Sequence, residues 1–321
     1  MTDITVVICA YTENRWDELC AAVQSAQNQS VSPREVILVI DHNPNLFKRA
    51  HEQFSDIVLM ENRETHGLAG ARNTAIENAQ GQMIAFLDDD AVAAPNWLQL
   101  LMAGYEDPQV VGVGGKLEPL WPKGRPSWFP EEFDWVVGCT YRGLPEQRAP
   151  IRNLIGANMS FRREVFEQVK FYSGIGHTPT NPFGGSDPDF CIRVTQSLPD
   201  KVLLYEPQAL VHHHVAEKRT HWNYYCLRCY NEGLSKSVLT RRVGSQVGLS
   251  SERRYTLRTL PKAALQGFGD ALRGDLTGLG RSFAIAAGLL ITATGYFIGL
   301  MRQRLAAWKS PARPNVQERV A

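Results

Sequence analysis

Three consecutive aspartates follow a hydrophobic segment near residue 90. Residues 83–87 are apolar, and Asp88, Asp89 and Asp90 come directly after them. Adjacent carboxylates repel one another, so such a run at the end of a buried strand is costly unless a cation or hydrogen-bond donors neutralise it. Ligands of open α/β sheets bind beyond the carboxyl ends of strands, and Mg²⁺ or Mn²⁺ typically bridges carboxylates to substrate phosphates there. The run therefore predicts a metal-assisted site for a phosphorylated donor. The alternative is a solvated acidic turn that caps a helix over 91–101.

The first 115 residues alternate between strand and helix patterns. Strands are expected at 4–10, 35–40, 56–61, 83–87 and 110–115, and helices at 16–27, 46–54 and 69–79. This alternation predicts βαβ units and a parallel sheet, which makes the fold class α/β. The first apolar run has no basic residues before it, so it is predicted to be a strand and not a signal peptide.

Composition excludes some classes of function. The 34 basic and 33 acidic residues give a formal charge of +1, so the chain has no overall nucleic-acid signature. Cys226 and Cys229 have suggestive spacing, but no second pair completes a zinc site. Reduced thiols without an export signal favour a cytoplasmic catalytic part.

The segment 118–145 is unusually aromatic for a loop. It carries three tryptophans, among them Trp128, between prolines and glycines. Such side chains need a partner, which is the body of the protein, an apolar substrate tail or a membrane interface.

The C-terminal region has the texture of a membrane-associated segment. Basic and apolar residues interleave over 253–273, as in a basic surface helix, although Pro261 and Gly267 interrupt the pattern. No charged residue lies between Arg281 and Arg302, and about twenty uncharged residues suffice to cross a bilayer. A full span, a hairpin, a helix lying on the membrane surface and a buried helix of a soluble protein all remain open.

Six short motifs carry a family resemblance. They are VVICAYTE at 6–13, Asp41, GLAGARN at 67–73, LDDD at 87–90, GANMSFRR at 156–163 and GGSDPDFCIR at 184–193. In this order and spacing they resemble the family 2 inverting glycosyltransferases, and in particular a branch assigned to extending lipid-linked glycans. The resemblance covers about residues 4 to 240.

The resemblance implies a GT-A fold, in which a Rossmann-like sheet binding a nucleotide sugar is fused to a mixed acceptor-binding sheet. The expected division is 1–115 for the nucleotide-sugar half, 116–240 for the acceptor half and 241–321 for a helical membrane-associated region. It implies an enzyme at the cytoplasmic face of the cell membrane that uses Mn²⁺ or Mg²⁺, a nucleotide sugar, with a UDP sugar as the preferred donor, and a lipid-linked or other glycan acceptor.

The resemblance also assigns roles to residues on the donor side. Asp41 should bind the nucleobase with Arg72 beside it, Asp88 or Asp89 should contact the ribose, and Asp90 should bind the metal. His213 matches a family histidine that completes the metal shell, although a packing role is the alternative. Tyr11 and Glu13, after the first strand, belong to the nucleotide-binding set.

On the acceptor side, inversion needs a base that takes a proton from the attacking hydroxyl. The family places it at the aspartate of a Glu-Asp pair, which here is Ser186-Asp187, so Asp187 is the expected base and Asp189 its competitor. The alternative for Asp187 is a helix N-cap before Pro188. Ser186, Asn158 and Trp128 are the expected acceptor contacts, with a turn-capping role as the alternative for Asn158. The missing glutamate puts the identity of the acceptor in doubt.

Two other functions remain in view. A metal-dependent sugar nucleotidyltransferase shares acidic metal sites, but such enzymes usually carry a glycine- and lysine-rich loop after the first strand, and residues 11–15 contain no glycine. A catalytically decayed nucleotide-sugar-binding protein is the third possibility, with Ser186 as the feature in its favour.

Overall fold

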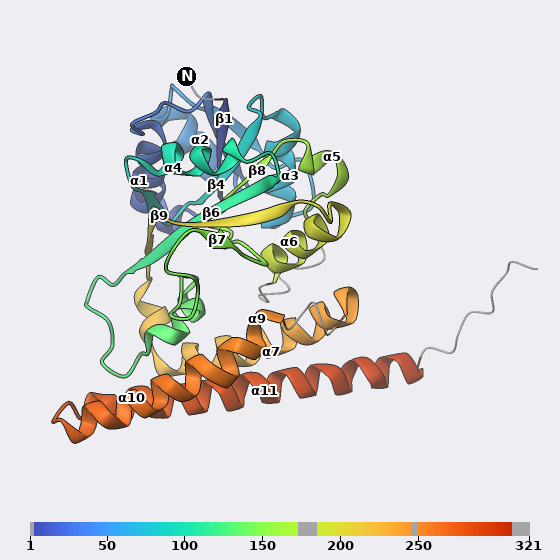
Figure 1. The fold of residues 1–321 in the computed structure, drawn as a ribbon. Coiled ribbons are helices and arrows are strands. Elements are labelled where there is room, and N and C mark those ends of the chain that lie inside the picture. The colour runs from blue at the N-terminus through green and yellow to red at the C-terminus, as the bar shows by residue number, and fades with distance from the viewer. Residues whose placement is uncertain (1–2, 173–184, 245–249, 310–321) are drawn as a thin grey trace, which may run out of the picture.

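A computed structural model describes residues 3–172, 185–244 and 250–309 (Figure 1). The described residues form one nine-stranded mixed sheet in the order β3-β2-β1-β4-β8-β6-β9-β5, with β7 paired to β9. The strands are β1 (Ile4–Ala10), β2 (Glu35–Ile40), β3 (Val58–Glu61), β4 (Met83–Asp88), β5 (Ala91–Ala93), β6 (Val110–Leu120), β7 (Ala149–Pro150), β8 (Asn158–Arg162) and β9 (Val202–His214).

The predicted α/β architecture is present, and its two predicted halves share a single sheet. Strands β3, β2, β1 and β4 are parallel, as the βαβ pattern predicts, and β8 then pairs antiparallel with β4. The boundary predicted after residue 115 lies inside β6, which pairs with both β8 and β9. The sheet therefore passes without interruption from the donor side to the acceptor side.

Helices cover both faces of the sheet because side chains alternate along each strand. Ile4, Val6 and Ile8 of β1 point into one apolar cluster, and Val7 points into the other. The first cluster includes residues of α1 (Trp16–Gln27), α2 (Pro44–Gln53) and α4 (Trp97–Ala103). The second includes residues of α3 (Leu68–Asn78), α5 (Val165–Gln168) and α6 (Ser186–Ser197).

The structure corrects the alternative prediction of a helix directly after the aspartate run. Residues 91–93 form β5, and α4 begins only at Trp97. The reason is β9, which pairs antiparallel with β5 and holds these residues in extended conformation. The run is therefore a turn between two strands.

The aromatic segment packs against the body of the protein, which was one of the three partners predicted for it. Phe129 and Phe133 are buried, and Tyr225 contacts both rings and that of Trp128. The ring of Trp128 also lies 5.1 Å from that of Trp222. These contacts join the segment to the C-terminal helices.

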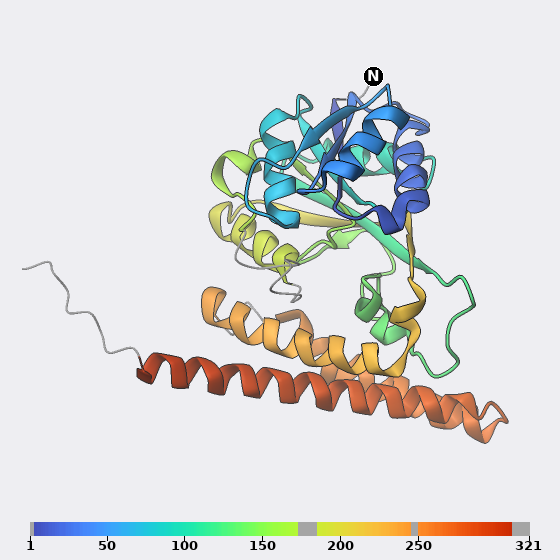
Figure 2. The ribbon, with the colours of Figure 1, turned by 180° about the vertical axis from the view of Figure 1, so that it is seen from behind.

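Those helices lie as a separate layer beneath the sheet (Figures 1 and 2). They are α7 (Trp222–Val243), α9 (Ser250–Arg254), a π-helical turn (Tyr255–Thr259), α10 (Leu260–Leu272) and α11 (Thr277–Lys309). The π-helical turn directly precedes Pro261, whose missing N–H and bulky ring disturb ordinary α-helical hydrogen bonding. The predicted interruption is thus a local change of helix type.

Among the described residues, one helix, α11, is both long enough and apolar enough to cross a membrane, judged by length and composition alone. Of the predicted C-terminal region 241–321, residues 245–249 and 310–321 lie outside the described residues.

Candidate active site

A cavity of about 770 Å³ opens at the carboxyl ends of the parallel strands. Part of its lining comes from the end of β1, Asp41, the start of α3 and the aspartate run, and another part comes from Gly156, Asp187 and α7. This is the edge of the sheet at which open α/β proteins bind ligands, and the volume suits a small organic ligand.

Strand pairing places the aspartate run beside a histidine that is distant in sequence. Register sets Ala91 of β5 opposite His213 of β9, and the backbone N–H of His214 donates to the carbonyl of Asp90 at 2.8 Å. Nε2 of His213 consequently lies 3.2 Å from Oδ1 of Asp90. Both side chains are buried.

Asp88, Asp90 and His213 form a group with the right composition for a divalent cation. Each offers one ligand atom, and these atoms lie within 4.8 Å of one another. Two carboxylates and an imidazole suit Mn²⁺, and Nδ1 of His213 is buried without a partner among the described residues. The structure thus brings together Asp90 and His213, as predicted, and adds Asp88, which was expected at the ribose. His212 and His214 point elsewhere, toward Glu118 and Glu18.

Arg15 balances the acidic group, and the sequence analysis missed it. Its Nη1 lies 2.6 Å from Asp90 and 3.0 Å from Asp89, and Arg219 lies 3.7 Å from Asp90. Burial raises the pKa of Asp89, and the charge of Arg15 only partly offsets it. For Asp90 burial acts the same way, but the hydrogen bond and charge of His213 with the two arginines lower its pKa. A basic residue shortly after the first strand was the available signal.

Tyr11 and Glu13, which follow β1, differ in their position relative to the cavity. Tyr11 lines the cavity, and the Arg15 guanidinium stacks on its ring at 5.0 Å. Glu13 is exposed in a short 3₁₀ turn and does not line the cavity. The structure therefore supports Tyr11 and gives Glu13 no place at the site.

Asp41 forms a buried corner of the cavity just after β2. Its carboxylate accepts from Nδ2 of Asn62 at 2.6 Å and from the backbone N–H of Gly67 at 2.9 Å. His42 and His66, both cavity residues, lie 2.8 and 3.2 Å from it with their rings 5.1 Å apart. The two histidines flank motifs that the sequence analysis had identified, yet it missed both.

Arg72 bridges the two parts of the cavity lining and does not lie beside Asp41 as predicted. It is buried on α3, where its Nη1 donates to Asp187 at 2.7 Å and its Nη2 to the carbonyl of Gly156 at 3.1 Å. Nη2 also lies 3.6 Å from Asp88. Because α3 starts close to the sheet edge, a long side chain there reaches the acceptor side.

Asp187 projects into the cavity from the first turn of α6. Gly185, with φ 108°, is the N-cap, so the alternative prediction of Asp187 as the cap is wrong. Asp187 accepts from Arg72, from the backbone N–H of Gly156 at 3.1 Å and from Ser186 Oγ at 3.3 Å. Its competitor Asp189 is buried and paired with Arg193 and Arg242 outside the cavity.

Two predicted acceptor contacts are packing residues. Asn158 is fully buried, accepts from Trp97 and donates to the carbonyls of Lys116 and Ala209, so its amide is used up inside the protein. Trp128 packs in the aromatic cluster and does not line the cavity. Ser186 does line it, together with Arg228 on α7.

Comparison with known proteins identifies the family. A family model described as glycosyl transferase family 2 matches residues 5–170. A glucosyl-dolichyl phosphate glucuronosyltransferase of Haloferax volcanii is 36% identical over 74% of this chain and 77% of its own. The chain belongs to glycosyltransferase family 2. It is accordingly an enzyme of the glycosyltransferase class, and the sugar nucleotidyltransferase alternative is not supported.

Two other similar proteins match a smaller part of the chain or are less similar in sequence. A UDP-Glc:alpha-D-GlcNAc-diphosphoundecaprenol beta-1,3-glucosyltransferase of Escherichia coli is 33% identical over 31% of this chain and 40% of its own. A mannosyltransferase from Pyrobaculum calidifontis, solved with GDP-Man and Mn²⁺, covers 96% of this chain and 88% of its own, with a TM-score of 0.58 and 19% identity. That likeness establishes a GT-A-like fold for this family 2 glycosyltransferase.

Proposed function

We propose that this glycosyltransferase moves one sugar, with inversion, from a nucleoside diphosphate sugar to a lipid-linked glycan at the cytoplasmic face of a membrane. One observation carries the proposal: a single cavity is lined both by the Asp88–Asp90–His213 group and by Asp187, and Arg72 lies 2.7 Å from Asp187 and 3.6 Å from Asp88. An inverting displacement needs two such groups at one site, because the leaving group and the base act on opposite faces of the sugar.

Donor binding is proposed for the wall formed by β1, β2 and α3. Asp41, with His42 and His66 beside it, would receive the nucleobase, and UDP is the preferred nucleotide. Asp88, Asp90 and His213 would hold Mn²⁺ or Mg²⁺, which supplies Lewis-acid stabilisation of the diphosphate leaving group. Arg15 and Arg219 both lie near Asp90 and would face the phosphates.

The chemical step is proposed for Asp187. A hydroxyl oxygen of the acceptor forms a bond to the anomeric carbon, its proton passes to a carboxylate oxygen of Asp187, and the bond from the anomeric carbon to the diphosphate breaks with its electron pair. Arg72 and the Gly156 N–H fix the carboxylate in place. Ser186, in place of the family glutamate, leaves Asp187 as the carboxylate of that pair in the cavity.

The lipid-linked acceptor is proposed from the relatives in Haloferax volcanii and Escherichia coli, whose names give a glucosyl-dolichyl phosphate and a diphosphoundecaprenol compound as acceptors. Arg228, one of whose guanidinium nitrogens is buried without a partner among the described residues, lines the cavity where such an acceptor would enter.

The test is a transfer assay with purified protein, a panel of nucleotide sugars and a membrane extract containing lipid-linked glycans. We expect a new glycolipid with one donor and no product from Asp187→Asn protein that still binds the nucleotide. Donor binding without transfer or donor hydrolysis in the wild type would instead support the catalytically decayed alternative.

A further inference from the structure

Most of the largest apolar side chains of α11 point away from the protein. Phe283, Leu290 and Phe297 are 65%, 68% and 63% exposed. The exposed apolar positions recur at helical spacing along one face, namely Leu279, Phe283, Leu289, Leu290, Phe297, Met301 and Leu305. A surface helix of a soluble protein has the opposite arrangement, with its apolar face inward.

The inward face of α11 carries mainly small residues, with Ile285 as a buried larger one. A Cβ at Gly288 would collide with Phe133 and Tyr225, and one at Gly295 would collide with the backbone of Tyr230. The Tyr225 hydroxyl donates to the carbonyl of Ala284 at 2.8 Å, and Gln303 donates to Ser237 at 3.1 Å. The contact therefore runs along α11 from residue 284 to 303.

The partner of α11 along this length is α7, which is also a wall of the active-site cavity. Tyr224, Arg228 and Glu232 of α7 line the cavity, while Tyr225 and Gly233 of the same helix contact α11. Figures 1 and 2 both show α11 extended along the base of the molecule, beneath α7. A helix held in this way cannot cross a bilayer without drawing α7 and the cavity wall into the hydrocarbon.

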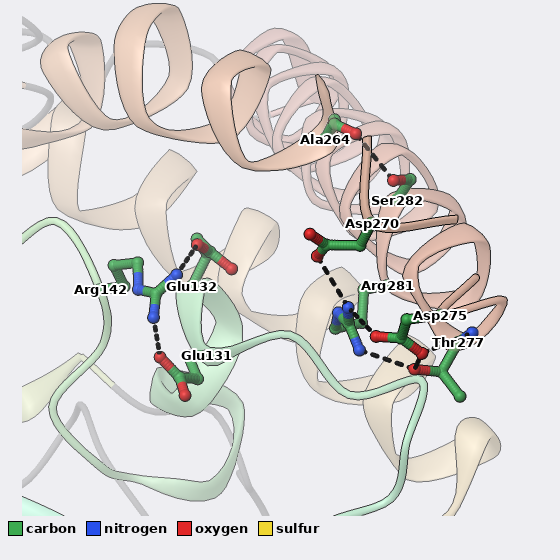
Figure 3. A network of polar contacts seen from close by, with 9 residues as sticks. All are labelled: Glu131, Glu132, Arg142, Ala264, Asp270, Asp275, Thr277, Arg281 and Ser282. Carbon is green, nitrogen blue, oxygen red and sulfur yellow. Dashed lines mark hydrogen bonds and ion pairs between the residues drawn. The ribbon is translucent and has the colours of Figure 1, made fainter. Parts of the chain in front are cut away.

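The α10–α11 pair is not built as a membrane-crossing hairpin either. With 13 residues, α10 is about 20 Å long, shorter than the roughly 30 Å hydrocarbon core. Gly267 and Gly278 bring the two helices into close contact. At the turn Arg281 binds Asp270, Asp275 and Thr277 (Figure 3). The same figure also draws the separate Arg142–Glu131 and Arg142–Glu132 ion pairs. Such a charged turn is costly to move across a membrane.

The charge around this face complements an anionic lipid surface. Residues 253–305 contain eight arginines and lysines but only two acidic residues, Asp270 and Asp275, and both of these are paired with Arg281. Exposed basic side chains flank the apolar face, namely Arg258, Lys262, Arg273, Arg302 and Arg304. Each such residue near an anionic membrane adds about 1 kcal/mol of attraction.

We propose that the α10–α11 hairpin lies in the plane of an anionic bilayer, with the outward face of α11 at the boundary between headgroups and acyl chains. Leu265, Phe268 and Leu272 of α10, all exposed, would add to the apolar surface. The catalytic domain then stands on the membrane with α7 between the cavity and α11. This inference deepens the proposed function by fixing the orientation of the cavity, but it depends on no step of the transfer reaction.

The experiment measures the depth of nitroxide labels in vesicles that contain phosphatidylglycerol. Cysteines are introduced singly at Leu279, Leu290 and Met301 of the full chain, after the half-exposed Cys9, Cys20 and Cys226 are changed to serine. A label at the exposed Glu52 of α2 is the control. Accessibility to oxygen and to a water-soluble nickel complex gives the depth.

The proposal predicts that all three α11 labels lie at one shallow depth, about 5–10 Å below the headgroups, and that the Glu52 label stays in water. A deep label at 290, about 15 Å down, with 279 and 301 at opposite surfaces, would show a span and overturn the proposal. Absence of lipid contact together with a dimer in sedimentation would overturn it too, because a second copy would then cover the face. The same labels on Asp187→Asn protein should report the same depth. The depth measurement therefore tests the membrane proposal even if the proposed transfer reaction is wrong.

Discussion

The active-site cavity and the α10–α11 hairpin depart from the usual distribution of side chains in opposite directions. In the cavity, Asp89, Asp90 and Arg72 are charged and nearly inaccessible to water. On the hairpin, Phe283 and Leu290 are apolar and mostly exposed. Folded domains usually bury apolar groups and expose charges. The exceptions therefore mark two surfaces that are not explained by the stability of the isolated chain, and we propose the first for a phosphorylated donor and the second for lipid.

The two regions also differ in how they are held. The cavity residues are fixed by charged hydrogen bonds between separate elements, such as Arg72 of α3 to Asp187 of α6. The hairpin is fixed by close backbone contacts at glycines, such as Gly295 against Tyr230. Substitutions in the first region should therefore change chemistry, and substitutions in the second should change stability or membrane binding.

The largest effect is expected from Asp187→Asn. Loss of a general base costs about 10²–10⁴-fold in rate, and asparagine keeps an acceptor for Arg72. We expect kcat to fall about 10³-fold while nucleotide binding is unchanged. The matched variant Asp189→Asn removes a carboxylate of the same helix that lies outside the cavity. If folded Asp189→Asn protein saturated with substrate lost kcat to a similar extent, the base would have to be reassigned to Asp189.

Glu252→Gln should have the next largest effect, on stability. Glu252 of α9 pairs with Lys236 at 2.6 Å and with Arg152 at 2.9 Å, and thereby ties α9 to α7 and the sheet domain. Burial alone would raise the pKa of Glu252, but the two cations outweigh it and lower the pKa from 4.5 to about 2. We expect the variant to lose about 2 kcal/mol of unfolding free energy at pH 7.

The pH dependence of that loss has a definite sign. Because the folded pKa is the lower one, the stabilisation is complete above about pH 4.5 and disappears as pH falls toward 2. Urea midpoints of the wild type and Glu252→Gln should therefore differ at pH 7 and converge in acid. A difference that is constant over this range would mean that the ion pairs do not stabilise the fold.

Gly295→Ala should destabilise the hairpin region by about 1–3 kcal/mol, because the added methyl group meets the Tyr230 backbone. Gly269→Ala on α10 is the control, since a Cβ there meets nothing within 4 Å. The control should gain up to about 1 kcal/mol from helix propensity. Thermal unfolding of both proteins measures the contrast, and equal shifts would argue against close packing of α11 on α7.

The smallest effect on stability is expected from Leu290→Gln on the outward face, within about 0.5 kcal/mol. Its affinity for anionic vesicles should fall about tenfold, since burying a leucine side chain is worth about 1.5 kcal/mol. Ile285→Gln is the control on the same helix, because Ile285 is buried and its replacement should destabilise the fold. Vesicle sedimentation and thermal unfolding separate the two results.

The sequence predicted the elements that depend on local pattern. The βαβ alternation, the strand before the aspartate run and the apolar C-terminal helix are all present, because periodicity and local charge determine them. The family was also recognisable from the order of the motifs. Asp90 and His213 could be paired in advance only through the family resemblance, since their approach depends on the register of β5 with β9.

Features that depend on the reach of single side chains were not predictable. Arg72 pairs with Asp187 and lies near Asp88. The amide of Asn158 donates to backbone carbonyls of β6 and β9, and Arg15 pairs with Asp90. Hydropathy likewise could not distinguish a spanning helix from α11 as it is packed, because it sums large and small apolar residues without regard to the face on which they lie.

Nucleotide binding at the Asp88–Asp90–His213 group is the most direct test of the proposed donor site. Thermal stability would be measured with UDP, GDP, dTDP, CDP and ATP, each with and without Mn²⁺, for the wild type, Asp90→Asn and the control Asp56→Asn, whose carboxylate is exposed. A ligand that binds the folded state stabilises it by about 2.7 kcal/mol at a hundred times its Kd. We predict a Mn²⁺-dependent shift with one nucleoside diphosphate in the wild type and Asp56→Asn, and none in Asp90→Asn. A full shift in Asp90→Asn, or no shift with any diphosphate in folded wild-type protein, would contradict the proposed site.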